Sequence, residues 1–428
     1  MAVKDRLVFE TALSDRTLDR LNDIGEADIV VGIPSYRSAR TIGRVARACS
    51  QGLSLDYPEL RAVLVNADGG SSDDSMGIVE ATSVGPRARV LSMSYNGLLG
   101  KGSAVRSILE VAARLRAQVC VVVEAKTESI TSDWVKTLAQ PILDGQYDVV
   151  LPLYRRHRRV AAPNDLLAYP MTWALYGLAV RQPTGGDFAI SGELAGDFAG
   201  RDVWETDVAR FGIDVWLTTL AVNEAHRICQ TDLGVKVNGL KDPALPMDPR
   251  FLQMTGTLFR LVSIYRNVWT RVTNWDRVVP TSSAAVDADL DDVPPPIEAL
   301  WQAALSGYQR YRPIWKNSLA DADFDAARRM LSRTEEGGFF PHDLWARVVY
   351  DFTVVYNKGE GDPDKVAQAL LPLFYVRTVS HLYETEGMTA QEREALVQAQ
   401  ARAFIRQRAY LWDRWVAYVP WLDKGTRI

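Results

Sequence analysis

Short apolar segments alternate with helical segments between residues 28 and 153, and this alternation constrains the fold more than any other feature of the chain. The apolar segments are residues 28–34, 61–66, 89–93, 118–123 and 148–153, and residues 39–50 and 103–116 have a helical pattern. Short apolar runs that end in turn residues predict buried parallel strands. Strands that alternate with helices predict a mostly parallel sheet with helices on both faces. This part of the chain is therefore predicted to form an α/β domain.

Polar residues follow several of the predicted strands. Asp68, Lys101 and Glu124 each lie at or shortly after a strand end. Ligands of such sheets bind beyond the carboxyl ends of the strands. We therefore expect the three side chains to converge on one crevice.

Beyond residue 240, helical patterns replace the alternation. Residues 249–275 have helical periodicity, residues 280–296 predict a linker rich in Ser, Asp and Pro, and the chain is helical from Pro296 onward. Asp362–Pro363 predicts an N-cap followed by a first-turn proline, Gly387 a helix end, and Thr389–Glu392 a capping box. Because 428 residues exceed what one core usually serves, we expect an α/β domain over 1–255, a helix and linker over 256–295, and a helical domain over 296–428.

Charge and cysteine content exclude several classes of protein. The net charge of −4 gives no electrostatic basis for binding a polyanion, so nucleic acid is not an expected partner. Cys49, Cys120 and Cys229 have neither zinc-site spacing nor a disulfide framework, and predict buried thiols in a reducing compartment. Glu10 and Asp15 interrupt the N-terminal stretch, so it does not have the apolar region of a secretory signal peptide. No window reaches the ~18 uninterrupted apolar residues of a membrane span. We expect a cytoplasmic protein without a transmembrane segment, with a homo-oligomer left open.

The strongest local motif is the turn Asp68-Gly69-Gly70-Ser71-Ser72-Asp73-Asp74-Ser75, which joins a strand to a helix. Its glycines permit close backbone approach, and Asp68 can accept hydrogen bonds from a base or a ribose. The alternative is an Asx-turn with a helix N-cap and no ligand. Both interpretations remain open from these residues alone.

Two further glycine motifs follow. Gly100-Lys101-Gly102 precedes a helix, where a lysine and exposed amides suit a phosphate, although the spacing is not that of a P-loop and a solvated loop is the alternative. Residues 182–188, Gln-Pro-Thr-Gly-Gly-Asp-Phe, pair two glycines with Asp187, and residues 211–215 supply Asp214. A turn and a helix cap explain these aspartates equally well.

Taken in order, these motifs resemble those of retaining glycosyltransferases of the GT-A type, namely the mannosylglycerate synthase and glucosyl-3-phosphoglycerate synthase group. The resemblance rests on the Asp68 turn, the Gly-Lys-Gly motif, an apolar strand ending in an acidic tripeptide, Gln-Pro-x-Gly-Gly and Gly-Ile-Asp. It spans roughly residues 28–270 and extends more faintly to Gly361–Asp364. It implies a GT-A domain followed by helices, and a hexose transfer from a nucleotide sugar to a small anionic acceptor such as glycerate or phosphoglycerate.

The resemblance also implies roles for individual residues. Asp187 and Asp214 would act at the reacting sugar. The donor would be bound by Pro34, Tyr36, Asp68, Lys101, Glu124, Lys126, Gly185 and Gly186, and the acceptor by Arg155, Arg156, Arg158, Arg159 and Thr172. Arginine suits an anionic acceptor because its guanidinium binds carboxylate or phosphate through two parallel hydrogen bonds. The competing interpretation of residues 155–159 is a solvated basic loop.

The chain departs from the family at its metal site. The family binds a divalent cation through Asp-x-Asp and a later histidine, but here the tripeptide is Glu124-Ala125-Lys126 and Asn238 stands in the histidine position. One glutamate and one amide are poor ligands for a hard dication. We therefore expect no metal, with the charge supplied by Lys126, and with Lys101 and Lys236 as further candidates. Mg²⁺ or Mn²⁺ is expected only if this tripeptide is not the counterpart of Asp-x-Asp, and its ligands would then be sought at Asp68, Asp187 and Asp214.

Three functions are compatible with these residues. The first is a glycosyltransferase that has replaced its cation with fixed positive charge. The second is a phosphorylase that uses a sugar 1-phosphate, which has one phosphate to bind and less need of a metal. The third is a catalytically silent protein that binds a sugar or a nucleotide. A thermal-shift ligand screen with and without EDTA is the single experiment that most narrows the choice among them.

Overall fold

The computed structural model describes residues 10–155, 158–238, 248–278, 280–281, 297–331 and 339–419. The chain divides into two compact units that are interleaved in the sequence. The first unit comprises Met1–Arg156, Thr184–Lys241 and Val278–Ala288, and the second comprises His157–Pro183, Asp242–Arg277 and Asp289–Ile428. The predicted domains 1–255, 256–295 and 296–428 are continuous stretches, whereas each of these units takes segments from several parts of the chain.

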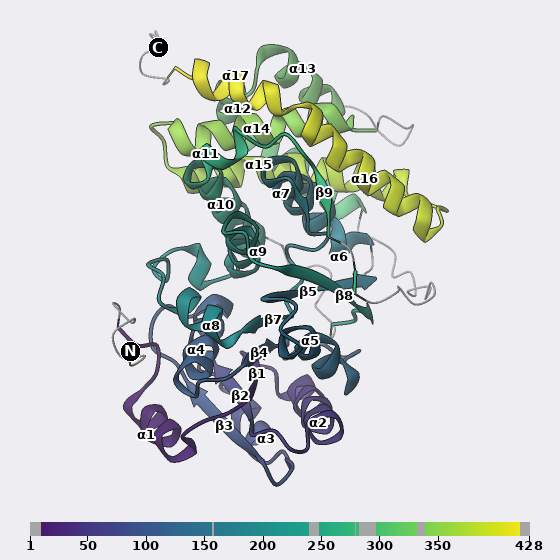
Figure 1. The fold of residues 1–428 in the computed structure, drawn as a ribbon. Helices are drawn as coiled ribbons and strands as arrows, with labels where there is room; N and C mark the ends of the chain where they lie inside the picture. Colours follow the sequence, from purple (N-terminus) through teal and green to yellow (C-terminus); the bar gives the residue numbers. More distant parts are fainter. Residues whose placement is uncertain are drawn as a thin grey trace. The chain divides into compact units, whose positions relative to one another are not determined.

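A seven-stranded sheet forms the centre of the first unit (Figure 1). Its strands are β1 (Ile29–Ser35), β2 (Ala62–Asp68), β3 (Ala88–Ser94), β4 (Val119–Val122), β5 (Val149–Arg155), β7 (Phe188–Ser191) and β8 (Ile228–Val235). They lie in the order β3-β2-β1-β4-β7-β5-β8. All neighbours are parallel except β7, which runs antiparallel between β4 and β5. β1 and β2 are buried at every position, as apolar runs in a sheet covered on both faces should be.

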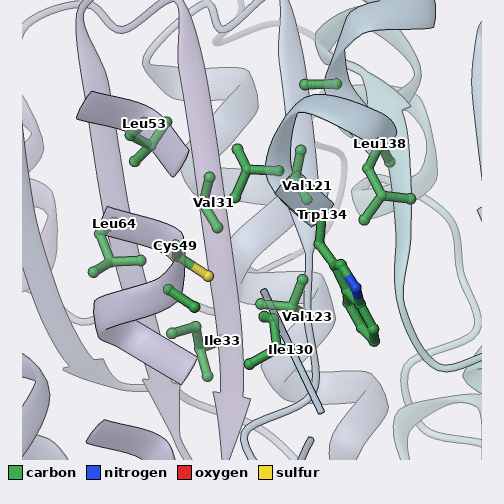
Figure 2. Close-up of a cluster of buried hydrophobic side chains, with 14 of the residues drawn as sticks. Val31, Ile33, Cys49, Leu53, Leu64, Val121, Val123, Ile130, Trp134 and Leu138 are labelled. Atoms are coloured by element: carbon green, nitrogen blue, oxygen red, sulfur yellow. The ribbon is translucent and has the colours of Figure 1, made fainter. Parts of the chain in front are cut away.

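Helices cover both faces of this sheet (Figure 1). One face carries α2 (Ala39–Asp56), α3 (Ser75–Glu80) and α5 (Asp133–Leu143), and the other carries α4 (Lys101–Arg114) and α8 (Gly192–Ala199). Figure 2 shows the core on the first face, where Val31 and Val121 of the sheet meet Cys49 of α2 and Trp134 of α5. A short 3-10 helix (Asp207–Ala209) and α9 (Ile213–Asn223) pack beside α4, and α1 (Asp15–Ile24) donates hydrogen bonds from Arg20 to β3.

The elements described in the second unit are helices, apart from the short strand pair β6 (Leu178–Ala179) with β9 (Asp276–Arg277). Its elements before residue 270 are α6 (Arg158–Pro163), a π-helical turn (Asn164–Ala168), α7 (Tyr169–Tyr176), α10 (Asp248–Ile264) and α11 (Arg266–Trp269). The later ones are α12 (Ile297–Ser318), α13 (Asp321–Met330), α14 (His342–Lys358), α15 (Pro363–Glu384), α16 (Ala390–Arg406) and α17 (Arg408–Ala417). α15 is buried along most of its length and contacts α10, α12 and α14, so it is the central helix of this unit.

The predicted fold class is confirmed: an α/β part with a mostly parallel sheet, and a helical C-terminal part in which every described element after residue 297 is a helix. The helix signals also hold, since Asp362 caps α15 with Pro363 in its first turn and Thr389 forms a capping box with Glu392 at α16. The predicted helix over 249–275 is interrupted after Ile264, and most of the predicted linker over 280–296 lies outside the described residues. Cys49, Cys120 and Cys229 are buried free thiols. None of the described helices is long and apolar enough to span a membrane.

Candidate active site

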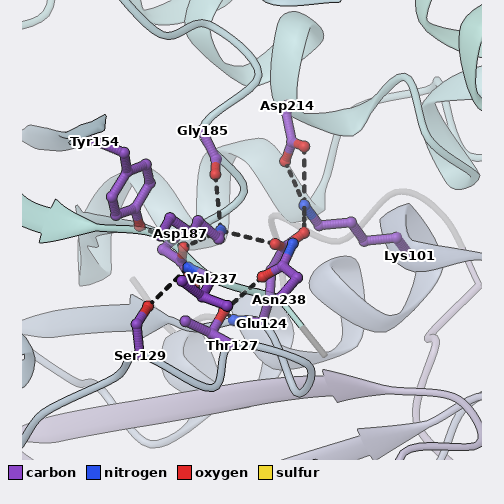
Figure 3. Close-up of polar contacts among 11 residues, drawn as sticks. Lys101, Glu124, Thr127, Ser129, Tyr154, Gly185, Asp187, Asp214, Val237 and Asn238 are labelled. Carbon is purple, nitrogen blue, oxygen red and sulfur yellow. Dashed lines mark hydrogen bonds and ion pairs between the residues drawn. The ribbon is translucent and has the colours of Figure 1, made fainter. Parts of the chain in front are cut away.

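Charged side chains of the first unit gather at the edge of the sheet where its parallel strands end (Figure 3). Glu124 follows β4, and Asp187 precedes the antiparallel strand β7, whose Phe188 pairs with Val122 of β4. This pairing brings the two residues together, and the backbone N–H of Glu124 donates to Asp187 Oδ1 at 2.7 Å. The exception to the parallel order therefore creates the corner in which two carboxylates meet.

Lys101 joins this corner from the start of α4. Its Nζ lies 3.0 Å from Glu124 Oε1 and donates to Asp214 Oδ1 and Oδ2 at 2.9 and 2.8 Å. Asp214 is in the first turn of α9, where a carboxylate also suits the positive end of the helix dipole. Glu124 is 28% exposed and Asp214 16% exposed, so this side of the cluster reaches solvent.

The glycines on either side of Lys101 have a packing role. A Cβ on Gly102 would lie 1.8 Å from the carbonyl oxygen of Val208, and one on Gly100 would lie 2.6 Å from that of Ala209. The N–H of Gly102 donates to Arg210 O at 2.9 Å. Gly-Lys-Gly is thus a close contact between α4 and the 3-10 segment, and the contact fixes the point from which Lys101 extends. The solvated-loop interpretation of this motif was wrong.

Lys236 reaches the same corner from the segment after β8. Its Nζ contacts Glu124 Oε2 at 2.7 Å, donates to the carbonyl of Gly185 at 3.0 Å, and makes a short hydrogen bond to Asp187 Oδ2. Asp187 Oδ2 also accepts a short hydrogen bond from Tyr154, whose ring lies 4.9 Å from Lys236 Nζ. Glu124 therefore bridges two ammonium groups, one on each carboxylate oxygen.

Glycine is required beside Glu124. Gly186 has φ +92°, and a Cβ there would lie 2.6 Å from the carboxyl carbon of Glu124. Both the backbone conformation and the space exclude a larger residue. The two predicted glycines thus lie against the cluster itself, with Gly185 as an acceptor and Gly186 as the space for a carboxylate.

Asn238 pairs with the segment after Glu124. Thr127 and Asn238 form an isolated antiparallel bridge, and Thr127 Oγ1 donates to Asn238 Oδ1 at 3.4 Å. The N–H of Val237 donates to Ser129 Oγ at 3.0 Å, and the N–H of Glu128 donates to Val237 O at 2.8 Å. These bonds fix the chain that carries Lys236.

The residues of this corner do not fit a divalent cation. Glu124 and Asp214 both pair with Lys101, and Glu124 and Asp187 both pair with Lys236, so each carboxylate already has an ammonium partner. Within the described residues, no group of three or more His, Cys, Asp or Glu side chains is placed to hold a metal ion. Lys101 and Lys236, the two further candidates from the sequence, both contact these carboxylates.

Burial and charge shift the pKa values of two members of the cluster. Burial raises the pKa of Asp214, against the opposing effect of Lys101 and with a contribution from Glu124. Burial alone would lower the pKa of Lys101, but the carboxylates of Asp214 and Glu124 outweigh it and raise that pKa. Lys101 therefore stays charged, and Asp214 takes up a proton more readily than an ordinary aspartate.

Asp68 is the last residue of β2, at the same edge of the sheet, but its carboxylate already accepts hydrogen bonds from neighbouring residues. It is buried, and it accepts hydrogen bonds from Ser35 Oγ at 2.6 Å and from the N–H and Oγ of Ser71 at 2.6 and 2.7 Å. These bonds are those of an Asx-turn, so the local geometry supports the alternative that needs no ligand. Pro34 is the penultimate residue of β1, and Tyr36 after it has an exposed ring.

The structure describes part of the predicted acceptor site. Arg155 pairs with Asp232 at 3.4 Å in the first unit. Thr172 is buried in α7 of the second unit, where its hydroxyl donates to Ala168 O at 2.9 Å within the helix. Arg156 and the side chains of Arg158 and Arg159 lie outside the described residues.

One contributor to the corner was not found from sequence, and another was given too little weight. Tyr154 gave no signal, because a tyrosine within an apolar strand is indistinguishable from core. Lys236 was only a secondary candidate, because sequence cannot show that it meets Asp187, 49 positions away. A lysine just past a strand end is the signal that could have given it more weight.

Comparison with known proteins gives the following. No protein family model matches the sequence, and no curated protein matches it. Solved structures similar to this chain include glucosyl-3-phosphoglycerate synthase from Mycobacterium tuberculosis in complex with Mn²⁺, UDP and glucosyl-3-phosphoglycerate, with 22% identity, a TM-score of 0.43, and 57% of this chain and 83% of that chain covered. Another structure of that enzyme, with Mn²⁺, UDP-glucose and phosphoglyceric acid, has 22% identity, a TM-score of 0.42 and coverage of 60% and 85%. A mycobacterial protein has 24% identity, a TM-score of 0.42 and coverage of 57% and 77%.

Proposed function

We propose that this chain is a glycosyltransferase that moves a hexose from a nucleotide sugar to a small anionic acceptor such as glycerate or phosphoglycerate, with retention of configuration and without a divalent cation. The observation that carries the proposal is the position of Lys101. Its ammonium is held between Glu124 and Asp214 at the carboxyl edge of a mostly parallel sheet, where ligands of such sheets bind. The ordered set of sequence motifs supports the class of donor and acceptor.

The chemistry requires positive charge at the leaving group. When the bond between the sugar and the diphosphate breaks, negative charge develops on the departing phosphate oxygen, and a preorganised cation stabilises it. Lys101 is the candidate for this role, because its pKa is raised and it therefore stays charged. Glu124 and Asp214 have partly exposed side chains and would accept hydrogen bonds from sugar hydroxyls.

Asp187 has a different role in this proposal. Its two oxygens accept from the N–H of Glu124, the hydroxyl of Tyr154 and the ammonium of Lys236. We infer that Asp187 positions Glu124 and does not itself contact the sugar.

The test is a donor and acceptor screen in EDTA. UDP- and GDP-linked hexoses are tested by thermal shift, and release of the nucleoside diphosphate and product mass are then followed with glycerate and with 3-phosphoglycerate. We expect one donor to raise the melting temperature by mass action, and release to require an anionic acceptor and to be unchanged by added Mg²⁺ or Mn²⁺.

Other results would assign the site differently. Turnover with a sugar 1-phosphate alone would identify the phosphorylase. Donor binding without release under any acceptor or metal condition would identify the silent binding protein. Release that stops in EDTA and returns with Mn²⁺ would contradict the cation-free reaction.

A further inference from the structure

The ammonium of Lys236 is enclosed on every side that the structure describes. Its side chain is 1% exposed, and its three acceptors are Gly185 O, Glu124 Oε2 and Asp187 Oδ2. A lysine ammonium has three N–H donors and no acceptor. All three donors are therefore used, each on a different oxygen of the same corner.

Hydrogen bonds fix the backbone that carries the Lys236 side chain. The N–H of Lys236 donates to Arg155 O at 3.0 Å, in register with the pairing of β5 and β8. The next residue, Val237, is bonded to Ser129 Oγ and to the N–H of Glu128. The backbone of Lys236 and that of the next residue are therefore both fixed by hydrogen bonds, so the starting point of the lysine side chain is fixed as well.

The carboxylates need a cation in this place. Asp187 has a fully buried side chain, and Glu124 lies beside it with its N–H bonded to Asp187 Oδ1. Two carboxylates that share a buried site cannot both stay ionised without compensation, and an unpaired buried charge is strongly unfavourable. Two carboxylate oxygens and a carbonyl are also the ligand types that a hard dication prefers.

We propose that Lys236 is the resident cation of this corner. Its ammonium takes the place that an oxygen-bound divalent cation would need, holds Asp187 and Glu124 in position, and closes the corner to Mg²⁺ and Mn²⁺. The inference goes beyond the proposed reaction, because it concerns the charge balance of the site whether or not a sugar is transferred.

The test compares Lys236→Met with the wild type. Methionine keeps an unbranched side chain, shorter than lysine by the terminal ammonium, and removes the charge. Lys136→Met is the matched control, because Lys136 pairs with Asp56 at the surface, away from the cluster. Binding is measured as the loss of the free Mn²⁺ electron paramagnetic resonance signal, and stability as the melting temperature in Mn²⁺ and in EDTA.

For the wild type and for Lys136→Met, we expect no Mn²⁺ uptake and the same melting temperature in both buffers. For Lys236→Met, we expect a melting temperature lower by about 5 °C or more, uptake of Mn²⁺, and partial recovery of the melting temperature in Mn²⁺. These readouts do not depend on transfer activity, so they fail or succeed separately from the proposed function.

A second variant keeps the proposal testable if Lys236→Met does not fold. Lys236→Met/Asp187→Asn removes one charge of each sign, and we expect it to fold and to take up no Mn²⁺. Mn²⁺ uptake by the wild type, a Lys236→Met variant as stable as the wild type, or a double variant that also fails to fold would overturn the proposal. The last result would show that Lys236 acts through packing and not through charge.

Discussion

Buried charges occur in both units, and they are arranged differently. In the first unit, two lysines meet three carboxylates, and the five residues come from the ends of four elements and from the loop before β7. In the second unit, Arg377, His381 and Glu384 lie on one face of α15, one turn apart. One cluster depends on the tertiary fold, and the other largely on a single helix.

Exposure separates the two clusters further. Arg377 is 0% exposed, and it donates to Glu384 Oε2 at 3.1 Å and to Gln400 Oε1 at 3.0 Å. In the first unit, the side chain of Glu124 is 28% exposed and that of Asp214 is 16% exposed. An enclosed pair suits stability or specificity of packing, whereas partly exposed acceptors suit a ligand. We therefore infer that the α15 cluster maintains the helical unit and that the Lys101 cluster carries function.

The largest effect is expected from Arg377→Met. Removing one partner of a buried ion pair leaves the other uncompensated, and this typically costs about 3–5 kcal/mol of the free energy of unfolding. Urea unfolding followed by circular dichroism measures the loss. Arg406→Met is the control, because Arg406 pairs with Asp343 at the surface, and there we expect a change within about 1 kcal/mol.

Turnover per folded molecule should not change in Arg377→Met. An Arg377→Met chain as stable as the control, or one with turnover lost at full stability, would break the proposed division between the clusters.

Lys101→Met should reduce transfer activity strongly and stability less, the opposite of Arg377→Met. We expect transfer to fall about 100- to 1000-fold, the usual effect of removing one preorganised group that stabilises developing charge. The loss of stability should be smaller than that of Arg377→Met, because Asp214, with its raised pKa, can accept a proton when its partner is removed. Product formation and the melting temperature are measured on the same preparation, with Lys136→Met as the control. A low melting temperature with normal turnover per folded molecule would make this cluster structural.

The sequence predicted the fold best where burial imposes a simple pattern. β1 and β2 are continuous apolar runs, and the helix caps at Asp362 and Thr389 use local hydrogen bonds, so both kinds of signal are readable. β7 has four residues and gains its stability from pairing with β4 and β5, which no local pattern records. The interleaving of the two units is a long-range property of the same kind.

The candidate site was predictable in its parts and not in its contacts. Asp187, Asp214 and Lys101 followed from motifs, but the contact of Lys101 with Asp214 spans 113 positions and became visible only in three dimensions. The departure from the metal motif was visible in Glu124-Ala125-Lys126, and Lys101 and Lys236 were named beside Lys126 as candidate charges. Only the structure shows that Lys101 and Lys236 each form an ion pair with Glu124.

The smallest of the expected effects concerns pH and the α15 cluster. His381 is buried, and its Nδ1 has no hydrogen-bond partner among the described residues. Burial, followed by the charge of Arg377, lowers the pKa of His381 to about 4, against the opposing effects of Asp165 and Glu384. Between the ordinary histidine pKa of about 6.5 and this value, the unfolded chain binds a proton at His381 and the folded chain does not.

Stability should therefore be unaffected by His381 above about pH 6.5 and should fall as the pH decreases toward 4, by up to about 3 kcal/mol from this group. The measurement is the urea midpoint from pH 7 to pH 4 for the wild type and for His381→Gln, whose side chain does not titrate. We expect the slope between pH 6.5 and 4 to be shallower in His381→Gln, with carboxylates such as Glu384 giving both proteins their remaining slope. Parallel slopes would show that His381 gains its proton as easily in the folded chain as in the unfolded one. The α15 cluster would then exchange protons with solvent, and the two clusters could no longer be distinguished by their exposure to solvent.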